Sequence, residues 1–163
     1  YKRVFVGALR AVDFITSLPQ YNGKALGVTG SSQGGALSMV TAALDKRVTF
    51  YAAIHPAMCD HRAHLQKVAG GWPHYFYYFP TPTPQRIQTA DYYDMVNFAR
   101  RITVPGWFSW GYNDDVCPPT STYAAYNSIT APKELHPYLE TGHYWYQEQY
   151  EQWSQWLWAQ MGL

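Results

Sequence analysis

The residue with the clearest chemical potential is Ser32, at the centre of the segment Gly30-Ser31-Ser32-Gln33-Gly34. A strand that turns sharply into a helix crowds the backbone around such a serine, so the positions two before and two after it favour glycine. The G-x-S-x-G spacing predicts a tight turn that presents the Ser32 hydroxyl as a nucleophile. Such a hydroxyl attacks a carbonyl carbon only when a base removes its proton, and that base works best when an acidic group orients it.

Asp114 and His143 are the candidates for the two partners of Ser32. Each follows a segment that predicts a strand, 104–110 before Asp114 and 134–138 before His143. Parallel strands end at the same edge of a sheet, so the three side chains are expected to meet there. The chain order serine, aspartate, histidine is that of α/β-hydrolases. We therefore expect a nucleophile, an orienting acid and a general base, in that order along the chain.

Asp115 and the other five histidines are not expected, as a first choice, to take part in the chemistry. Asp115 is the alternative to Asp114, which would then cap the helix after Pro118 and Pro119. The other histidines lie beside apolar residues and prolines, or form a pair without a third ligand, so no metal site is predicted. They are assigned structural roles: His55, His74, His136, and the pair His61 and His64.

The elements that must position these residues alternate along the chain. Apolar residues at helical spacing predict helices, and continuous apolar runs rich in β-branched and aromatic residues predict buried strands. This alternation predicts an α/β fold in which a parallel sheet carries helices on both faces. The expected helices cover 4–15, 35–44, 92–99, 119–128 and 146–159, and the expected strands cover 25–29, 48–54, 104–110 and 134–138.

One stretch departs from this alternation, at about 55–90. It contains Gly70-Gly71-Trp72-Pro73, an aromatic run at 75–79 and the proline-rich run 80–84. We interpret it as an irregular insertion. The 163 residues otherwise form one catalytic domain portion, because the length suits one hydrophobic core.

Composition excludes several classes of partner. The net charge is +1, and the basic residues form no stripe, so nucleic acid is not expected. No apolar run reaches the roughly 20 residues that span a bilayer, so no membrane segment is predicted. Two cysteines, Cys59 and Cys117, are too few to form a disulfide framework. The chain is expected to be soluble, but its compartment is left open.

Aromatic residues make up 18% of the chain, which suggests a non-enzymatic alternative. Aromatic rings stack on sugars, so the chain could be a sugar-binding or assembly module. In the last helix, however, Tyr146, Tyr150, Trp153 and Leu157 recur at the spacing of a face packed on the core. Trp156 and Trp158 are expected to point elsewhere, toward an oligomer contact or an N-terminal portion of the protein.

Longer segments around these motifs resemble carbohydrate esterase family seven, the acetyl xylan esterase and cephalosporin C deacetylase family. The resemblance covers nearly the whole chain and is strongest in Gly30-Ser-Ser-Gln-Gly-Gly35 and in Asn113-Asp-Asp-Val-Cys-Pro-Pro119 with its continuation to Asn127. It implies an α/β-hydrolase fold in which Ser32 is the nucleophile, Asp114 rather than Asp115 is the acid, and His143 is the base. It also implies that the backbone N–H of Gln33 is one oxyanion donor.

The same resemblance implies a serine esterase that needs no cofactor and removes acetyl groups from xylo-oligosaccharides or similar small esters. A general carboxylesterase or lipase is the alternative within the same chemistry. Family members are about twice as long, so this chain would be a C-terminal portion, beginning at the helix before the nucleophile strand. An N-terminal portion would then supply the first strands and the second oxyanion donor. A homo-oligomer is also implied, and the expected substrate rim consists of Trp72, Tyr144 and Trp145.

Overall fold

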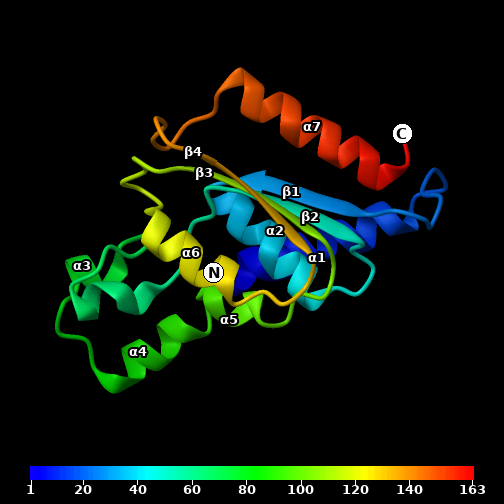
Figure 1. Ribbon diagram of the computed structural model, residues 1–163. Coiled ribbons are helices and arrows are strands. Elements are labelled where there is room, and N and C mark those ends of the chain that lie inside the picture. The colour runs from blue at the N-terminus through cyan, green and yellow to red at the C-terminus, as the bar shows by residue number, and fades with distance from the viewer.

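The computed structural model describes all 163 residues and is organised around one parallel sheet (Figure 1). The four strands lie in the order in which they occur in the chain, and each pairs in parallel with the next. Each connection between neighbouring strands contains at least one helix, as expected for parallel strands. The strands are β1 (Gly27–Ser31), β2 (Phe50–Ile54), β3 (Gly106–Gly111) and β4 (Lys133–Tyr138).

Helices cover both faces of the sheet, which confirms the predicted α/β architecture (Figure 1). One face carries α1 (Lys2–Ser17), α2 (Gln33–Leu44), α5 (Met95–Ala99) and α6 (Pro119–Asn127), and the other carries α7 (Gln147–Met161). The strands and all helices outside the 55–90 segment lie close to their predicted ranges, apart from the late start of α5. None of the helices combines the length and apolar character needed to span a membrane.

The two central strands are buried on both faces, as the continuous apolar run at 48–54 predicts. Tyr51 and Phe108 face the large core cluster beneath α2, α5 and α6, where their rings meet edge to face at 5.6 Å. Ile54 and Trp107 point to the opposite face, where Trp153 and Leu157 of α7 pack on them. Side chains alternate between faces along a strand, so each central strand contributes to both core layers.

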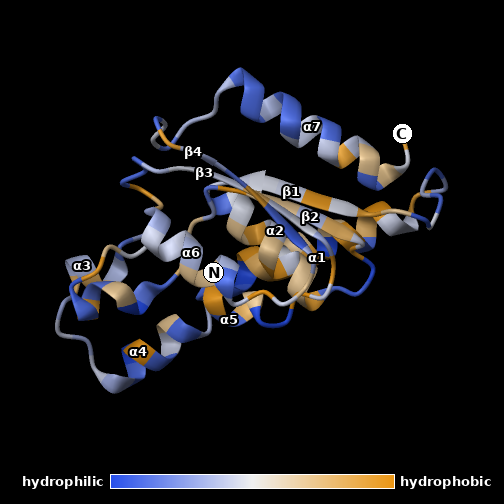
Figure 2. Cartoon of the chain, viewed as in Figure 1, coloured by the Kyte–Doolittle hydropathy of each residue, from blue (hydrophilic) through white to orange (hydrophobic).

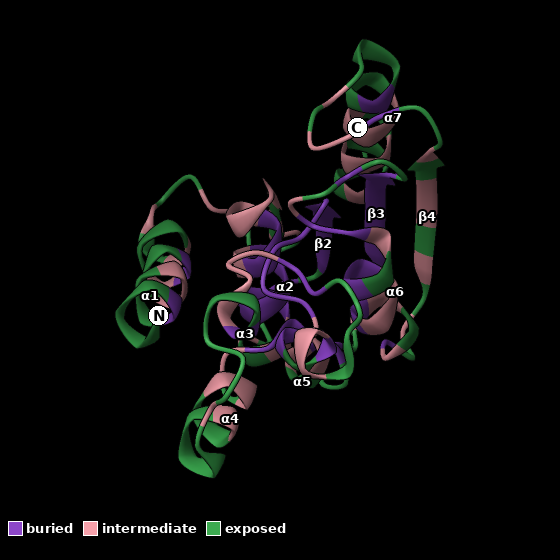
Figure 3. Cartoon of the chain, turned by 90° about the vertical axis from the view of Figure 1, so that its left-hand side faces the viewer, coloured by how far each residue is buried: buried purple, intermediate pink, exposed green.

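Burial and hydropathy follow this layering. β2, β3 and α2 form the most buried part of the molecule, whereas α1 and α4 are largely exposed (Figure 3). α2 is mainly hydrophobic along its length, whereas α7 is mainly hydrophilic (Figure 2). The buried face of α2 packs on both β1 and β2, and this contact holds the start of α2 at the end of β1.

The segment 55–90 is less irregular than predicted. It contains a 3₁₀ helix, η1 (His61–Gln66), and two short helices, α3 (Tyr75–Tyr78) and α4 (Pro84–Asp91). The expectation of an irregular run was wrong at 84–91, because Thr83 caps this helix and Pro84 occupies its first turn, where no N–H is needed.

The predicted helix at 92–99 begins later than expected, at Met95. The Asp94 side chain accepts the N–H of Val96 at 2.9 Å and caps the helix there. Tyr92 instead ends α4. Helix α5 is therefore short and separate from α4.

The aromatic face of α7 is only partly as predicted. Trp153 and Leu157 pack on the sheet, but Tyr146 and Tyr150 are exposed. Trp156 also packs inward, against the expectation that it points away. Its ring meets that of Phe50 edge to face at 5.8 Å, and its N–H donates to Glu134 at 2.9 Å. Trp158 does point outward and is 60% exposed.

We predict that Phe108→Ala destabilises the fold strongly, because Phe108 is fully buried between the rings of Tyr51 and Tyr126. The free energy of unfolding in urea should fall by about 3–5 kcal/mol. The matched control is Phe14→Ala, in which a phenylalanine that is 63% exposed is removed. It should change this free energy by less than about 0.5 kcal/mol. A loss in Phe108→Ala as small as that expected for Phe14→Ala would contradict the core position of Phe108.

Candidate active site

Ser32 lies at the junction of β1 and α2, as predicted, and its backbone is strained. Its φ is 53° and its ψ is −118°, a conformation that non-glycine residues rarely adopt. A Cβ atom added to Gly30 would lie 2.4 Å from the backbone of Gly34, so the turn requires glycine at position 30. The expectation that position 34 also requires glycine was wrong, because a Cβ atom there would meet nothing within 4 Å outside its own helix turn. The close approach involves its backbone only.

The three predicted residues form a continuous chain of hydrogen bonds. The Ser32 Oγ and His143 Nε2 atoms are 2.9 Å apart, and His143 Nδ1 lies 2.8 Å from Asp114 Oδ2. Because a carboxylate accepts hydrogen bonds, the Nδ1 atom carries the proton and Nε2 is free to accept the proton of Ser32. The other oxygen of Asp114 accepts the N–H groups of Val116 and Cys117 at 2.9 and 2.7 Å. These bonds fix the carboxylate, which is fully buried.

Asp115, the alternative acid, lies outside this chain. Its side chain is exposed and has no hydrogen bond to His143. Asp114 does not cap α6 in its place, because the N-cap of α6 is Pro118. The geometry therefore favours Asp114.

The loops after β3 and β4 are joined to each other, and this holds Asp114 beside His143. The N–H of Asn113 donates to the carbonyl of Thr141 at 2.9 Å, and its side-chain amide donates to the carbonyl of Leu139 at 3.1 Å. Gly111 approaches Thr141 so closely that an added Cβ would lie 2.2 Å from its carbonyl oxygen. The two loops thus form one unit.

Gln33, the predicted oxyanion donor, is the first residue of α2. The first N–H groups of a helix have no partner within the helix, and the helix dipole favours negative charge at that end. The backbone N–H of Gln33 is therefore suitably placed next to Ser32 to bind a developing oxyanion. Its role stays a prediction.

The three predicted rim residues occupy different environments. Trp72 is half-buried, packs on the main core and meets the ring of Tyr1 edge to face at 6.4 Å. Tyr144 is 51% exposed, and its ring lies 5.7 Å from that of Tyr146. Trp145 points its N–H toward the Ser31 hydroxyl at 3.4 Å. The rim assignment stays a prediction for all three, and Trp145 is the one that contacts the nucleophile turn.

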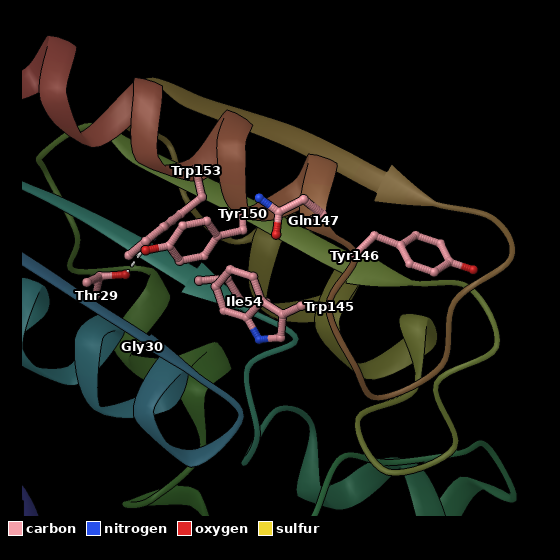
Figure 4. A pocket seen from close by; sticks show the side chains of 8 residues that line it. All are labelled: Thr29, Gly30, Ile54, Trp145, Tyr146, Gln147, Tyr150 and Trp153. Carbon is pink, nitrogen blue, oxygen red and sulfur yellow. Dashed lines mark hydrogen bonds between the residues drawn. The ribbon is translucent and has the colours of Figure 1, made fainter.

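An aromatic pocket of about 450 Å³ lies between α7 and the end of β1 (Figure 4). In Figure 4, the rings of Trp145, Tyr150 and Trp153 line one side of the pocket, whereas Tyr146 points away from them. The N–H of Trp153 donates to the Thr29 hydroxyl at 2.9 Å, which ties α7 to β1. The lining residues are Thr29, Gly30, Ile54, Trp145, Tyr146, Gln147, Tyr150 and Trp153.

His55 lies beside the three hydrogen-bonded residues, a position that its sequence pattern did not indicate. We expected a structural histidine, but its ring lies against that of His143, with centroids 4.2 Å apart. Its Nε2 atom is 2.6 Å from the hydroxyl of Ser31. The available signal was its position directly after the predicted strand 48–54, because Ser32, Asp114 and His143 also follow predicted strands within a few residues.

His55, Asp114 and His143 place three potential metal-ligand atoms within 4.8 Å of one another. A metal would nevertheless have to replace existing hydrogen bonds, because both nitrogens of His143 are already engaged with Asp114 and Ser32. The donor set therefore suits proton transfer better than metal binding.

The chain is similar to known proteins over nearly its whole length. The family model described as acetyl xylan esterase (AXE1) matches residues 1–160. The acetyl esterase Axe7A of Xylanibacter ruminicola is 55% identical over 133 residues, which are 82% of this chain and 30% of that protein.

Two solved structures share the fold. The acetyl xylan esterase from Paenibacillus sp. R4 superposes with a TM-score of 0.86 at 30% identity, over 98% of this chain and 52% of that one. The acetyl xylan esterase 1 from Thermoanaerobacterium sp. JW/SL YS485 superposes with a TM-score of 0.80 at 27% identity, over 96% and 52% of the two chains. The chain thus spans about half the length of these structures and less than a third of the Xylanibacter protein.

The parallel sheet, the order of its site residues and these superpositions confirm the α/β-hydrolase fold. They also confirm the resemblance of the sequence to acetyl xylan esterases. The family match covers far more than half of the residues. The chain belongs to the acetyl xylan esterase family.

Proposed function

We propose that this protein is a serine esterase that removes acetyl groups from acetylated xylo-oligosaccharides or similar small acetyl esters, including cephalosporin-type esters. The observation that carries the proposal is the hydrogen-bonded chain from Asp114 through His143 to Ser32. Relatives named acetyl esterase and acetyl xylan esterase support the acetyl group as the acyl part.

In the proposed first step, Ser32 Oγ attacks the acetyl carbonyl carbon while His143 Nε2 takes the hydroxyl proton. Asp114 holds the ring and stabilises the imidazolium that forms. The C–O bond to the sugar then breaks, and His143 returns the proton to the leaving oxygen. The products are a deacetylated alcohol and an acetyl ester of Ser32.

In the second step, a water molecule attacks the acetyl-enzyme and His143 takes a proton from that water. Acetate leaves, and the proton returns to Ser32 Oγ. Each step passes through an oxyanion, which the N–H of Gln33 would stabilise. The exposed Tyr144 and the neighbouring Trp145 would contact the sugar or the acyl group at the rim, and Trp72 would contribute from the core side.

We also infer that a further strand, from an N-terminal portion of the same protein, pairs with the outer edge of β1. β1 pairs only with β2, so its other edge presents free backbone groups. Apolar pockets of about 450 and 460 Å³ border this strand, one beside α7 and the other between α1 and α2. An added strand would fill both and could bring the second oxyanion donor.

A homo-oligomer remains part of the proposal, because Trp158 presents a large apolar ring that is 60% exposed. No nucleic acid or membrane partner is proposed. The alternatives to an acetyl esterase are a general carboxylesterase and a sugar-binding module, and the first test distinguishes them.

The first test is hydrolysis of p-nitrophenyl acetate by the longest natural form of the protein, with Ser32→Ala as the variant. We expect turnover to fall by about 10⁶-fold, to the level left by binding and oxyanion donors alone. Acetate should be preferred over butyrate if the acyl pocket is specific. Similar rates on both esters would indicate a general carboxylesterase, and no Ser32-dependent hydrolysis would favour the sugar-binding module.

The second test separates the two adjacent aspartates. Asp114→Asn should lower turnover by about 10⁴-fold, because an amide no longer holds the reactive tautomer of His143. Asp115→Asn is the matched control and should change turnover less than twofold, because that side chain is exposed and does not contact His143. The reverse ranking would assign the orienting acid to Asp115.

The third test compares this chain alone with the longer protein, assayed on the same ester. One missing oxyanion donor lowers turnover by about 10²- to 10³-fold, so the isolated chain should be slower by at least this factor. Equal turnover numbers would mean that residues 1–163 contain the complete site, and would contradict the added strand as the source of the second donor.

A further inference from the structure

His55 makes the closest aromatic contact of His143. The two ring centroids are 4.2 Å apart and the ring planes are tilted by 45°. The opposite ends of the His143 ring are held by Asp114 and Ser32, and these bonds act in the plane of the ring. They resist a tilt of the ring about the line that joins the two nitrogens less than they resist movement along that line. A group packed on the ring face restrains that tilt.

Holding His55 in this position carries several energetic penalties. Only 1% of its surface is exposed, and its Nδ1 atom is buried without a hydrogen-bond partner. Its φ is 29°, in the left-handed region that non-glycine residues rarely adopt. A buried polar atom without a hydrogen-bond partner is destabilising, and strained backbone is concentrated at functional sites. An apolar side chain at this position would avoid the unpaired atom.

Two contacts to the ring of His55 and one to its backbone hold this residue in place. The Ser31 hydroxyl lies 2.6 Å from its Nε2 atom, and the N–H of Trp145 points at that same hydroxyl at 3.4 Å. The Trp145 ring also meets the His55 ring edge to face, with centroids 6.3 Å apart. The backbone N–H of His55 donates to the carbonyl of Ser109 at 2.7 Å. Residues of β1, β3 and the loop before α7 therefore hold His55 in place.

The His55 ring is also uncharged at neutral pH. Burial, followed by the proximity of His143, lowers the pKa of His55 to about 4. A neutral ring does not repel the positive charge that develops on His143 when it takes the serine proton. The ring can thus pack on the base without opposing its protonation.

We propose that His55, held by Ser31 and Trp145, is a positioning residue that keeps the ring of His143 in line with Ser32. The inference rests on the proposed esterase function. It assigns Trp145 to the support of the base rather than to the substrate rim alone. The ring of His55 matters more in this role than its hydrogen bond to Ser31, because the ring is the part that contacts His143.

The test uses three substitutions of His55 in the full-length protein, assayed on p-nitrophenyl acetate. His55→Ala removes both the ring and the hydrogen bond, His55→Gln keeps a polar group for Ser31 without a ring, and His55→Phe keeps the ring without a polar group. Misplacement of a catalytic group by about 1 Å lowers turnover by about 10²-fold. We expect kcat to fall by about 10- to 100-fold in the alanine and glutamine variants, with KM changed less than about twofold, and most of kcat to return in His55→Phe.

A second readout is independent of turnover. The proton shared by His143 Nδ1 and Asp114 gives a low-field proton NMR signal when the ring is held in place. This signal should broaden or vanish in His55→Ala and His55→Gln and persist in His55→Phe. The control is His136→Ala, which removes a histidine ring stacked on Trp107, with centroids 5.1 Å apart, on another part of the sheet. It should leave both kcat and the signal unchanged.

The proposal is overturned if His55→Ala retains kcat within twofold, or if the phenylalanine variant loses as much activity as the glutamine variant. Equal losses in His136→Ala would also overturn it, because they would reflect general destabilisation. If His55→Ala does not fold, the phenylalanine and glutamine variants decide between the ring and the hydrogen bond. If Ser32→Ala remains active, the esterase mechanism fails, and the NMR signal alone then tests whether His55 positions His143.

Discussion

Parallel pairing of the four strands in a single register is the constraint on which the rest of the structure depends. Ser31 is level with Ile54, Ile54 is level with Ser109, and Gly111 is level with Tyr138. All four strands therefore end at one edge of the sheet, and the segments that follow them reach the same space. Ser32 and His55 come directly after β1 and β2, and the loops after β3 and β4 bring Asp114 and His143 back to the same place. One backbone constraint thus assembles four side chains that are distant in sequence.

The molecule accepts local strain at this edge and offsets it by packing elsewhere. Ser32 and His55 both adopt positive φ angles, and Asp114 is buried as a carboxylate. Each is held by many weaker contacts: the tight approach of Gly30 to Gly34, the N–H groups of Val116 and Cys117, and the aromatic layers on both faces of β2 and β3. Strain of this kind persists only where the surroundings determine the conformation more strongly than the residue itself does. The large buried rings beneath the site are therefore part of its geometry.

Many of the aromatic residues fill the hydrophobic core, which accounts for much of the high aromatic content. Tyr51, Phe108 and Trp110 fill the core on one face of the sheet, and Trp107, Trp153 and Trp156 fill the other. The rings that remain exposed are mostly tyrosines, in the 75–79 segment and around Tyr144. The outer edge of β1 is unpaired and is bordered by two apolar pockets.

The sequence by itself determined the α/β alternation, the strands and most helices to within a few residues, the nucleophile turn and the identity of the three hydrogen-bonded residues. These features depend on local patterns: apolar runs, glycine spacing and the position of polar residues after strands. The hydrogen bond from His143 to Asp114 agrees with the family resemblance in favouring Asp114 over Asp115, a choice that strand position leaves open because adjacent residues differ only in where their side chains point. The folded chain also showed that Trp156 packs inward and that His55 contacts His143, since both contacts depend on which elements lie opposite. Helix α4 was missed because the same prolines that break a helix can also begin one, and that choice depends on a cap and on packing. Contacts between distant segments carry no local pattern, and so only the folded chain reveals them.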